Sequence, residues 1–188
     1  MTWLAEKLLK WRGWRFVGLL PDLDKMIIIG APHTSNWDFF LFLAACRHWR
    51  FSPRFVGKHT LFRWPLGYFF RALGGIPVDR SRPGGIILQV AEEFERSDKI
   101  VLVMAPEGTR KSAPFWKSGF VRIAAEANVP IVPAYVDFPA RRVVLGDPVE
   151  VDDGEKALMD RLRAFYEPGV GKGGKGKGPV RLKEERSV

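Results

Sequence analysis

The chain has one cysteine and no long apolar run. Cys46 is the single cysteine among 188 residues, which excludes an intramolecular disulfide, and no Cys/His cluster has zinc-finger spacing. The longest uncharged apolar run, Phe39 to Cys46, is far shorter than the roughly 20 residues of a membrane-spanning helix. The first residues lack the apolar block of a signal peptide. We therefore expect a cytoplasmic protein with no transmembrane helix and no disulfide framework.

The sequence also lacks the motifs of covalent catalysis. It contains no Gly-x-Ser-x-Gly elbow and no cysteine adjacent to a histidine, so a serine or cysteine nucleophile has no support. Ser35 lies two residues from His33, but its residue type and place favour a helix cap. A catalytic histidine here would need a substrate that brings its own nucleophile, such as an alcohol.

Positive charge and aromatic residues are plentiful instead. Lys and Arg number 30 against 21 Asp and Glu, which gives a formal net charge of +9, and there are seven Trp and fourteen Phe. With 46% hydrophobic residues, a chain of this length can bury the core of one domain, which excludes disorder of the whole chain. A basic, aromatic surface suits nucleic acid or an anionic membrane, and composition leaves both open.

The charge is concentrated at the two ends of the chain. Residues 1–20 are predicted to form an amphipathic N-terminal helix, running from residue 2 to residue 16. Residues 169–188 are rich in Gly and Lys and are predicted to be a flexible basic tail. Residues 21–168 make up the predicted folded domain.

Apolar runs alternate with helical patterns along this domain, which predicts a single α/β domain: a mostly parallel central sheet flanked by helices. Pro77 places its strand at a sheet edge or an irregular position. Strands are expected at 26–29, 54–57, 76–78, 100–104, 131–136 and 142–145, and helices at 37–47, 84–96, 120–127 and 155–166.

Three of the expected strands end in residues that can do chemistry. If these strands are parallel, their carboxyl ends form one crevice, where α/β sheets bind ligands. The segments after the strands contain, in chain order, His33 and Asp38, then Arg80, then Glu107, Gly108, Thr109 and Arg110.

His33 and Asp38 have the spacing of an oriented general base. A carboxylate bonded to one imidazole nitrogen fixes the tautomer and leaves the other nitrogen free to accept a proton near neutral pH. The alternative, in which Asp38 caps a helix and His33 fills a turn, stays open. The turn at Glu107 to Arg110 would expose backbone N–H groups and an arginine fork to a phosphate, with Arg80 as a second fork. A surface turn with a salt bridge is the alternative there.

Four sequence blocks together resemble the glycerolipid acyltransferase family, which includes the 1-acylglycerol-3-phosphate acyltransferases. The resemblance covers about residues 28–140. The blocks are His33–Asp38, Gly75–Arg80, Pro106–Arg110 and Val129–Pro133, with Trp116–Gly119 as an extension of the third. Pro32, Pro77 and Ala105 depart from the family's usual residues beside the pocket, which bears on the choice of acceptor.

The resemblance implies an O-acyltransferase without an acyl-enzyme intermediate, a metal or a cofactor. His33 would be the general base and Asp38 its partner, acting on a lysophospholipid hydroxyl, with acyl-CoA or acyl carrier protein as donor. Arg80, Glu107, Gly108, Thr109 and Arg110 would bind the acceptor. The residues Lys58, Val129, Pro130, Ile131 and Pro133 would serve the acyl donor or the structure.

An amphiphilic acceptor implies a peripheral protein on the cytoplasmic face of an anionic membrane. Residues 3–15 and 61–70 are candidates for shallow insertion, with ordinary core packing as the alternative for each. Three other functions stay open: an acyltransferase for a different lysolipid or alcohol, a thioesterase-like hydrolase, and a basic nucleic-acid-binding module. No recognition helix or aromatic-basic sheet motif supports the last of these.

Overall fold

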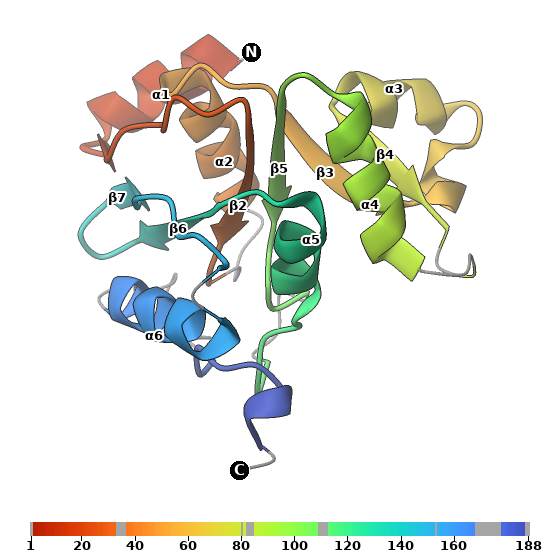
Figure 1. Cartoon of the computed structure of the whole chain (residues 1–188). Helices are drawn as coiled ribbons and strands as arrows, with labels where there is room; N and C mark the ends of the chain where they lie inside the picture. The colour runs from red at the N-terminus through yellow and green to blue at the C-terminus, as the bar shows by residue number, and fades with distance from the viewer. Residues whose placement is uncertain are drawn as a thin grey trace.

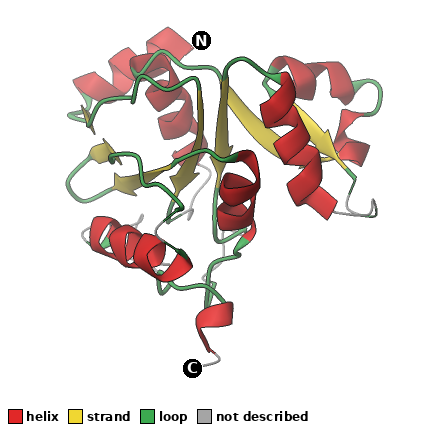
Figure 2. Cartoon of the chain, viewed as in Figure 1, coloured by secondary structure: helices red, strands yellow, loops and turns green. Residues whose placement is uncertain are grey.

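The computed structural model describes residues 2–32, 37–79, 81, 85–108, 113–152, 154–167 and 178–186. Its centre is a sheet in the strand order β1-β7-β6-β2-β5-β3-β4, with helices packed around it (Figures 1 and 2). The strands are β1 (Arg15–Val17), β2 (Lys25–Gly30), β3 (Pro53–Lys58), β4 (Gly75–Val78), β5 (Ile100–Met104), β6 (Ile131–Asp137) and β7 (Arg142–Leu145). The α-helices are α1 (Thr2–Trp11), α2 (Trp37–His48), α3 (Leu66–Ala72), α4 (Gly85–Arg96), α5 (Gly119–Ala127) and α6 (Glu155–Tyr166), and the 3-10 helices are η1 (His59–Phe62) and η3 (Glu184–Arg186).

Most of the sheet is parallel, which confirms the predicted single α/β domain. β2 pairs in parallel with both β5 and β6, and β3 pairs in parallel with β5 and β4. β7 runs antiparallel to β6, and β1 follows the direction of β7. The carboxyl ends of β2, β3, β4, β5 and β6 therefore lie at one edge of the sheet, where α/β folds place their ligands.

β2 is buried on both faces because its side chains alternate between two hydrophobic clusters. Ile27 and Ile29 pack with residues of α4, α5 and α6, whereas Met26 and Ile28 face the opposite side, which α1 and α2 cover. All four side chains are at most 4% exposed. A continuous β-rich run is what a parallel strand needs when helices cover both of its faces.

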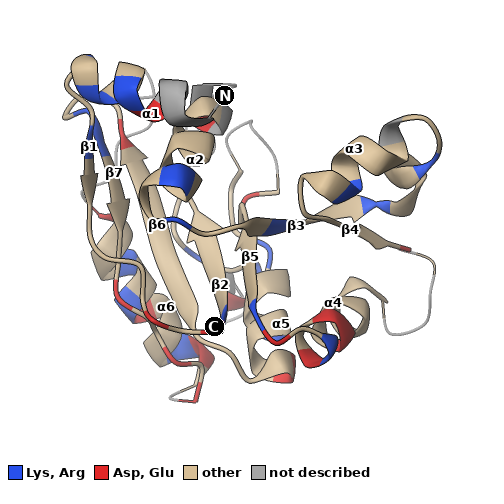
Figure 3. Ribbon diagram, turned by 90° about the horizontal axis from the view of Figure 1, so that it is seen from above, with Lys and Arg blue, Asp and Glu red and all other residues tan. Residues whose placement is uncertain are grey.

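β3 belongs to two strand pairs. Its first residues, Pro53 and Arg54, pair with β5, whereas Phe55 to Lys58 pair with β4. β3 and β4 consequently lead away from the rest of the sheet together with α3, as Figure 3 shows. β4 is an edge strand, which confirms the placement predicted from Pro77.

The N-terminal helix is shorter than predicted. α1 ends at Trp11, not near residue 16, because Gly13 has a φ of 81°, which favours glycine and turns the chain out of the helix. The amide of Gly13 donates to the Lys10 carbonyl at 2.9 Å, and that of Trp14 donates to the Leu9 carbonyl at 3.0 Å. These are the two bonds of a Schellman motif. Residues 1–20 are thus a helix followed by the edge strand β1.

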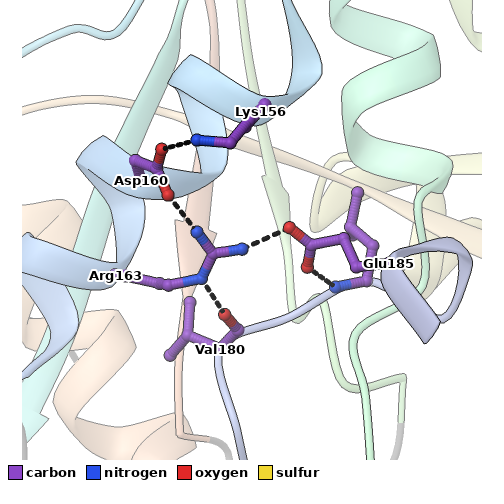
Figure 4. A network of polar contacts seen from close by, with 6 residues as sticks. Lys156, Asp160, Arg163, Val180 and Glu185 are labelled. Carbon is purple, nitrogen blue, oxygen red and sulfur yellow. Dashed lines mark hydrogen bonds and ion pairs between the residues drawn. The ribbon is translucent and has the colours of Figure 1, made fainter. Parts of the chain in front are cut away.

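The C-terminal segment, residues 178–186, also differs from the prediction, which places it in a flexible tail. Leu182 is fully buried and forms a β-bridge with Trp116. The Arg163 guanidinium donates to the Val180 carbonyl at 3.0 Å and pairs with Asp160 and Glu185 (Figure 4). The prediction of a flexible tail is wrong for residues 178–186, because one apolar side chain and one ion-pair network hold them. Residues 168–177 lie outside the described part of the chain.

No helix in the described ranges is both long enough and apolar enough to cross a membrane. The longest, α2, α4 and α6, have 12 residues each.

Leu182→Ala should lower the free energy of unfolding by about 2–4 kcal/mol, because it leaves a cavity in the core. Leu19→Ala is the matched control, since the Leu19 side chain is 87% exposed, and it should change stability by less than about 0.5 kcal/mol. Urea unfolding at neutral pH measures both. Equal, small effects would show that the C-terminal segment is a free tail in solution.

Candidate active site

The first part of the site is the passage from β2 to α2. β2 continues its pairing beyond Gly30, since the Ala31 amide donates to the Ala134 carbonyl at 3.1 Å. Asp38 lies in the first turn of α2 and is buried, at 8% exposure. A carboxylate at this position also faces the positive end of the helix dipole. Residues 33–36, which include His33, lie outside the described residues, so their placement stays a prediction.

The second part is the turn that follows β5. The Gly108 amide donates to the Ala105 carbonyl at 3.0 Å and closes the turn, and Gly108 has a φ of 62°, which favours glycine. Glu107 is buried within the turn, at 5% exposure. Thr109 and Arg110 lie outside the described residues.

Lys117 lies across this turn and is a site residue that the sequence reasoning did not single out. Its backbone amide donates to the Pro106 carbonyl at 2.9 Å. Its ammonium reaches Gly108 so closely that a Cβ atom on that glycine would stand 2.8 Å from Lys117 Nζ. An exposed cation therefore sits directly over the Gly108 turn. The only signal in the sequence was its place in the block that extends the Glu107–Arg110 motif.

One small cavity joins the ends of β2 and β5. Pro32, the residue before His33, and the buried Glu107 both line it, and the C-terminal segment closes one side through Gly178 and Val180. Ala31, Trp116 and Tyr166 complete the lining. The structure therefore brings together two of the three strand ends that the sequence predicted to meet.

Tyr166 lines this cavity and connects two strands of the sheet. Its hydroxyl donates to the Ile29 carbonyl at 2.6 Å and accepts from the Ala134 amide at 3.2 Å, so it bridges β2 and β6. Complete burial, with a further contribution from the negative charge of Glu107, raises the pKa of the Tyr166 hydroxyl far above its usual range. The sequence predicts Tyr166 only as the last residue of a helix, because no local pattern indicates that its hydroxyl bonds to two strands.

The third strand end, after β4, is fixed at Asp79. The Asp79 amide donates to Gln89 Oε1 at 2.9 Å, and Gln89 Nε2 donates back to the Asp79 carbonyl at 2.7 Å. The Asp79 carboxylate accepts from the amide and hydroxyl of Ser81 at 2.9 and 2.6 Å. The backbone is thus held on both sides of Arg80, which itself lies outside the described residues.

The residues predicted to serve the acyl donor or the structure do not gather at one place. Lys58 is exposed at the carboxyl end of β3, on the side of the site. Val129 and Ile131 are buried in the main hydrophobic cluster, and with the half-buried Pro130 they lie at the amino end of β6, away from the strand ends of the site. Pro133 is buried opposite Ile29. Packing supports the structural role for Val129 and Ile131.

Comparisons with known proteins agree on one family. A family model described as Acyltransferase matches residues 18–137. The chain is 28% identical over 131 residues to the 1-acyl-sn-glycerol-3-phosphate acyltransferase of Bacillus subtilis (strain 168), which covers 62% of this chain and 65% of that protein. It is 35% identical over 85 residues to the protein of the same name from Limnanthes alba, covering 42% of this chain and 30% of that protein. The chain thus spans just under two thirds of the bacterial relative and about a third of the plant one.

Among solved structures, the chain resembles the crystal structure of the 1-acyl-sn-glycerophosphate (LPA) acyltransferase PlsC from Thermotoga maritima. The TM-score is 0.59 and the sequence identity 18%, and the match covers 88% of this chain and 76% of that one. At this identity the likeness shows a shared fold.

Tyr166→Phe should lower the free energy of unfolding by about 1–3 kcal/mol at neutral pH, because it leaves a buried carbonyl and a buried amide without their partner.

The raised pKa of the Tyr166 hydroxyl also makes the free energy of unfolding depend on pH. The unfolded chain ionises near about pH 10 while the folded hydroxyl stays neutral, so wild-type stability falls as the pH rises above that value. Tyr166→Phe has no hydroxyl at this position, so it should lose this part of the decline in stability. Urea unfolding from pH 7 to 11 tests it, with the exposed Tyr68→Phe as control; parallel curves for Tyr166→Phe and wild type would contradict it.

Proposed function

This chain belongs to the acyltransferase family, and from that premise we propose that it acylates a lysophospholipid. The reaction moves a fatty acyl group from an acyl thioester, acyl-CoA or acyl carrier protein, to the free hydroxyl of 1-acylglycerol-3-phosphate and yields phosphatidate. The names of the matched Bacillus and Limnanthes proteins support this acceptor. Because acceptor and product are amphiphiles, the protein is proposed to work at a membrane surface, which we place on the cytoplasmic face of an anionic membrane. A different lysolipid acceptor is the alternative.

The single observation that carries the proposal is the cavity shared by the ends of β2 and β5. It places Pro32, one residue before His33, beside the buried Glu107. Asp38, five residues after His33, is buried at the start of α2, which follows the same strand. We propose that Asp38 bonds to the His33 imidazole, because a carboxylate paired with a histidine at the ligand edge of a parallel sheet orients a general base.

The proposed chemistry needs no protein nucleophile. His33 accepts the proton of the acceptor hydroxyl while that oxygen attacks the thioester carbonyl carbon, and Asp38 holds the imidazole and stabilises its protonated form. The tetrahedral intermediate then collapses, and its carbon–sulfur bond breaks. The leaving thiolate takes the proton from the imidazolium, so the products are an ester and a free thiol.

The acceptor's phosphate is proposed to bind at the turn after β5 and at the end of β4. Arg80 and Arg110 are the forks suited to a phosphate, and the Gly108 and Thr109 amides can donate to it. Lys117 Nζ, which lies over Gly108, adds a third cation to this group. Glu107 is buried and lines the cavity, and its negative charge is proposed to offset those of the basic residues that bind the phosphate.

His33→Gln should lower the rate of phosphatidate formation by about two to four orders of magnitude, because the general base is lost. Asp38→Asn should lower kcat as well, with a smaller loss. Product is measured by mass spectrometry with lysophosphatidate and acyl-CoA or acyl carrier protein as donors. His48→Gln is the matched control, since His48 ends α2 far from Asp38. A His33→Gln enzyme with turnover near wild type would rule out this mechanism.

Lys117→Gln should raise KM for lysophosphatidate about tenfold and leave kcat within a few-fold, because one charge-assisted hydrogen bond to the bound phosphate is lost. KM for the acyl donor should stay the same. Lys156→Gln is the control, since Lys156 lies on the exposed side of α6 and pairs with Asp160. If Lys117→Gln changed both substrates' KM values equally, Lys117 would not bind the acceptor head.

A further inference from the structure

An exposed aromatic surface lies on the segment between β3 and β4, which we call the arm (residues 59–74, containing η1 and α3). The side chains of Trp64, Tyr68 and Phe69 are 84%, 78% and 59% exposed, and Leu61 and Leu73 are also exposed. This is the largest aromatic exposure within the described residues. The arm projects from the body of the protein beside β3 and β4 (Figure 3).

The arm packs onto the sheet through one other aromatic side chain. Phe62 is buried, and its ring packs against two glycines, so that a Cβ atom would stand 2.9 Å from the ring on Gly57 and 2.6 Å from it on Gly75. Phe70 meets the Phe62 ring edge-on at a centroid distance of 6.1 Å. Since Phe62 already fills the space over the two strands, Trp64, Tyr68 and Phe69 are excess to the core.

The arm also has charge of one sign only. Residues 59–74 include Arg63 and Arg71 and no Asp or Glu. Both arginines are exposed, and the Arg71 guanidinium lies 5.5 Å from the centroid of the Phe62 ring, at the base of the aromatic surface. Figure 3 shows this basic charge on the arm. Aromatic rings flanked by arginines suit the boundary between the headgroups and acyl chains of an anionic leaflet.

α1, the other segment predicted to insert, is largely committed to the protein. Leu9 packs with Leu41 of α2, and Glu6 accepts a bond from His48 Nδ1 at 3.1 Å. Trp11 remains exposed on α1, but the helix carries the acidic Glu6 and packs against α2 through Leu9. Of the two candidates, the arm alone combines a packed base, an exposed aromatic surface and charge of one sign.

We propose that the arm docks the protein on an anionic bilayer, with Trp64, Tyr68 and Phe69 inserted at headgroup depth and with Arg63 and Arg71 on acidic headgroups. The choice of a bilayer rests on the proposed function, whose acceptor is an amphiphile. The arm begins at the carboxyl end of β3, the edge that also carries Glu107, and His59 Nδ1 of η1 lies 3.9 Å from Asp79 Oδ1 beside Arg80. Docking there brings the membrane to the acceptor-binding edge of the sheet.

Co-sedimentation of the full chain with vesicles tests the docking. Vesicles of phosphatidylglycerol and phosphatidylcholine are compared with vesicles of phosphatidylcholine alone. The double variant with Trp64→Gln and Phe69→Gln, which we call the arm variant, should weaken partitioning into anionic vesicles about tenfold or more. Arg63→Gln should weaken it about fivefold on anionic vesicles and leave neutral ones unchanged. Trp11→Gln is the matched control and should stay within about twofold of wild type, and thermal unfolding confirms that each variant is folded.

Unchanged vesicle binding by the Trp64 and Phe69 variant would overturn the docking proposal, and so would an equal loss of binding with Trp11→Gln. If vesicle binding is unchanged and that variant instead changes its oligomeric state by size exclusion, the arm is a self-association surface.

Acyl transfer to a short-chain lysophosphatidate, dissolved below its micelle concentration, separates this proposal from the proposed function. The arm variant should transfer to the dissolved acceptor at the wild-type rate and lose activity only on vesicles. If wild type binds vesicles through the arm and yet transfers to neither acceptor, the docking stands and the proposed function fails. If transfer to vesicles survives loss of the arm surface, the function stands and the docking fails.

Discussion

The pairing of β2 between β5 and β6 is the constraint on which the rest of the structure depends. Four consecutive side chains of β2 are buried in two different clusters, so a register slip by one residue would exchange the two faces and is strongly disfavoured. That register sets Ile29 opposite Met104 on one side and Pro133 on the other. Both loops of the candidate site therefore leave the sheet at the same level, and the Tyr166 hydroxyl ties β2 to β6 just beneath them.

Much of this fold could be predicted from the sequence, because its elements depend on local patterns. The strands Ile100–Met104 and Arg142–Leu145 and the helix Glu155–Tyr166 have the predicted bounds, since apolar periodicity and β-branched residues mark them directly. The meeting of strand ends followed from the parallel alternation. What the pattern missed depends on distant partners: Leu182 is buried only because Trp116 and Arg163 reach the C-terminal segment, and its Lys- and Gly-rich neighbourhood gives no sign of this.

Residues of the site divide in the same way. The sequence blocks pointed to Glu107, Gly108 and Asp38, which the structure places at the predicted edge of the sheet, whereas Lys117 and Tyr166 become visible only through contacts that no spacing encodes. The arm shows the same limit. From its aromatic run, core packing and exposure were equally open. The contacts of two glycines decide the question, because the single ring of Phe62 fills the space that Gly57 and Gly75 leave. Part of the positive charge lies on the arm, at Arg63 and Arg71, and part lies at Lys117 over the Gly108 turn.

The central claim is acyl transfer to an alcohol acceptor without an acyl-enzyme, and the most direct test is the stoichiometry of the two products. Free thiol and phosphatidate are measured together from the same reaction of the full chain with an acyl thioester, with and without lysophosphatidate. We expect one phosphatidate for each thiol when the acceptor is present, and thiol release at the background rate when it is omitted. Thiol release that continues unchanged without acceptor, with free fatty acid as the product, would contradict transfer and identify a hydrolase.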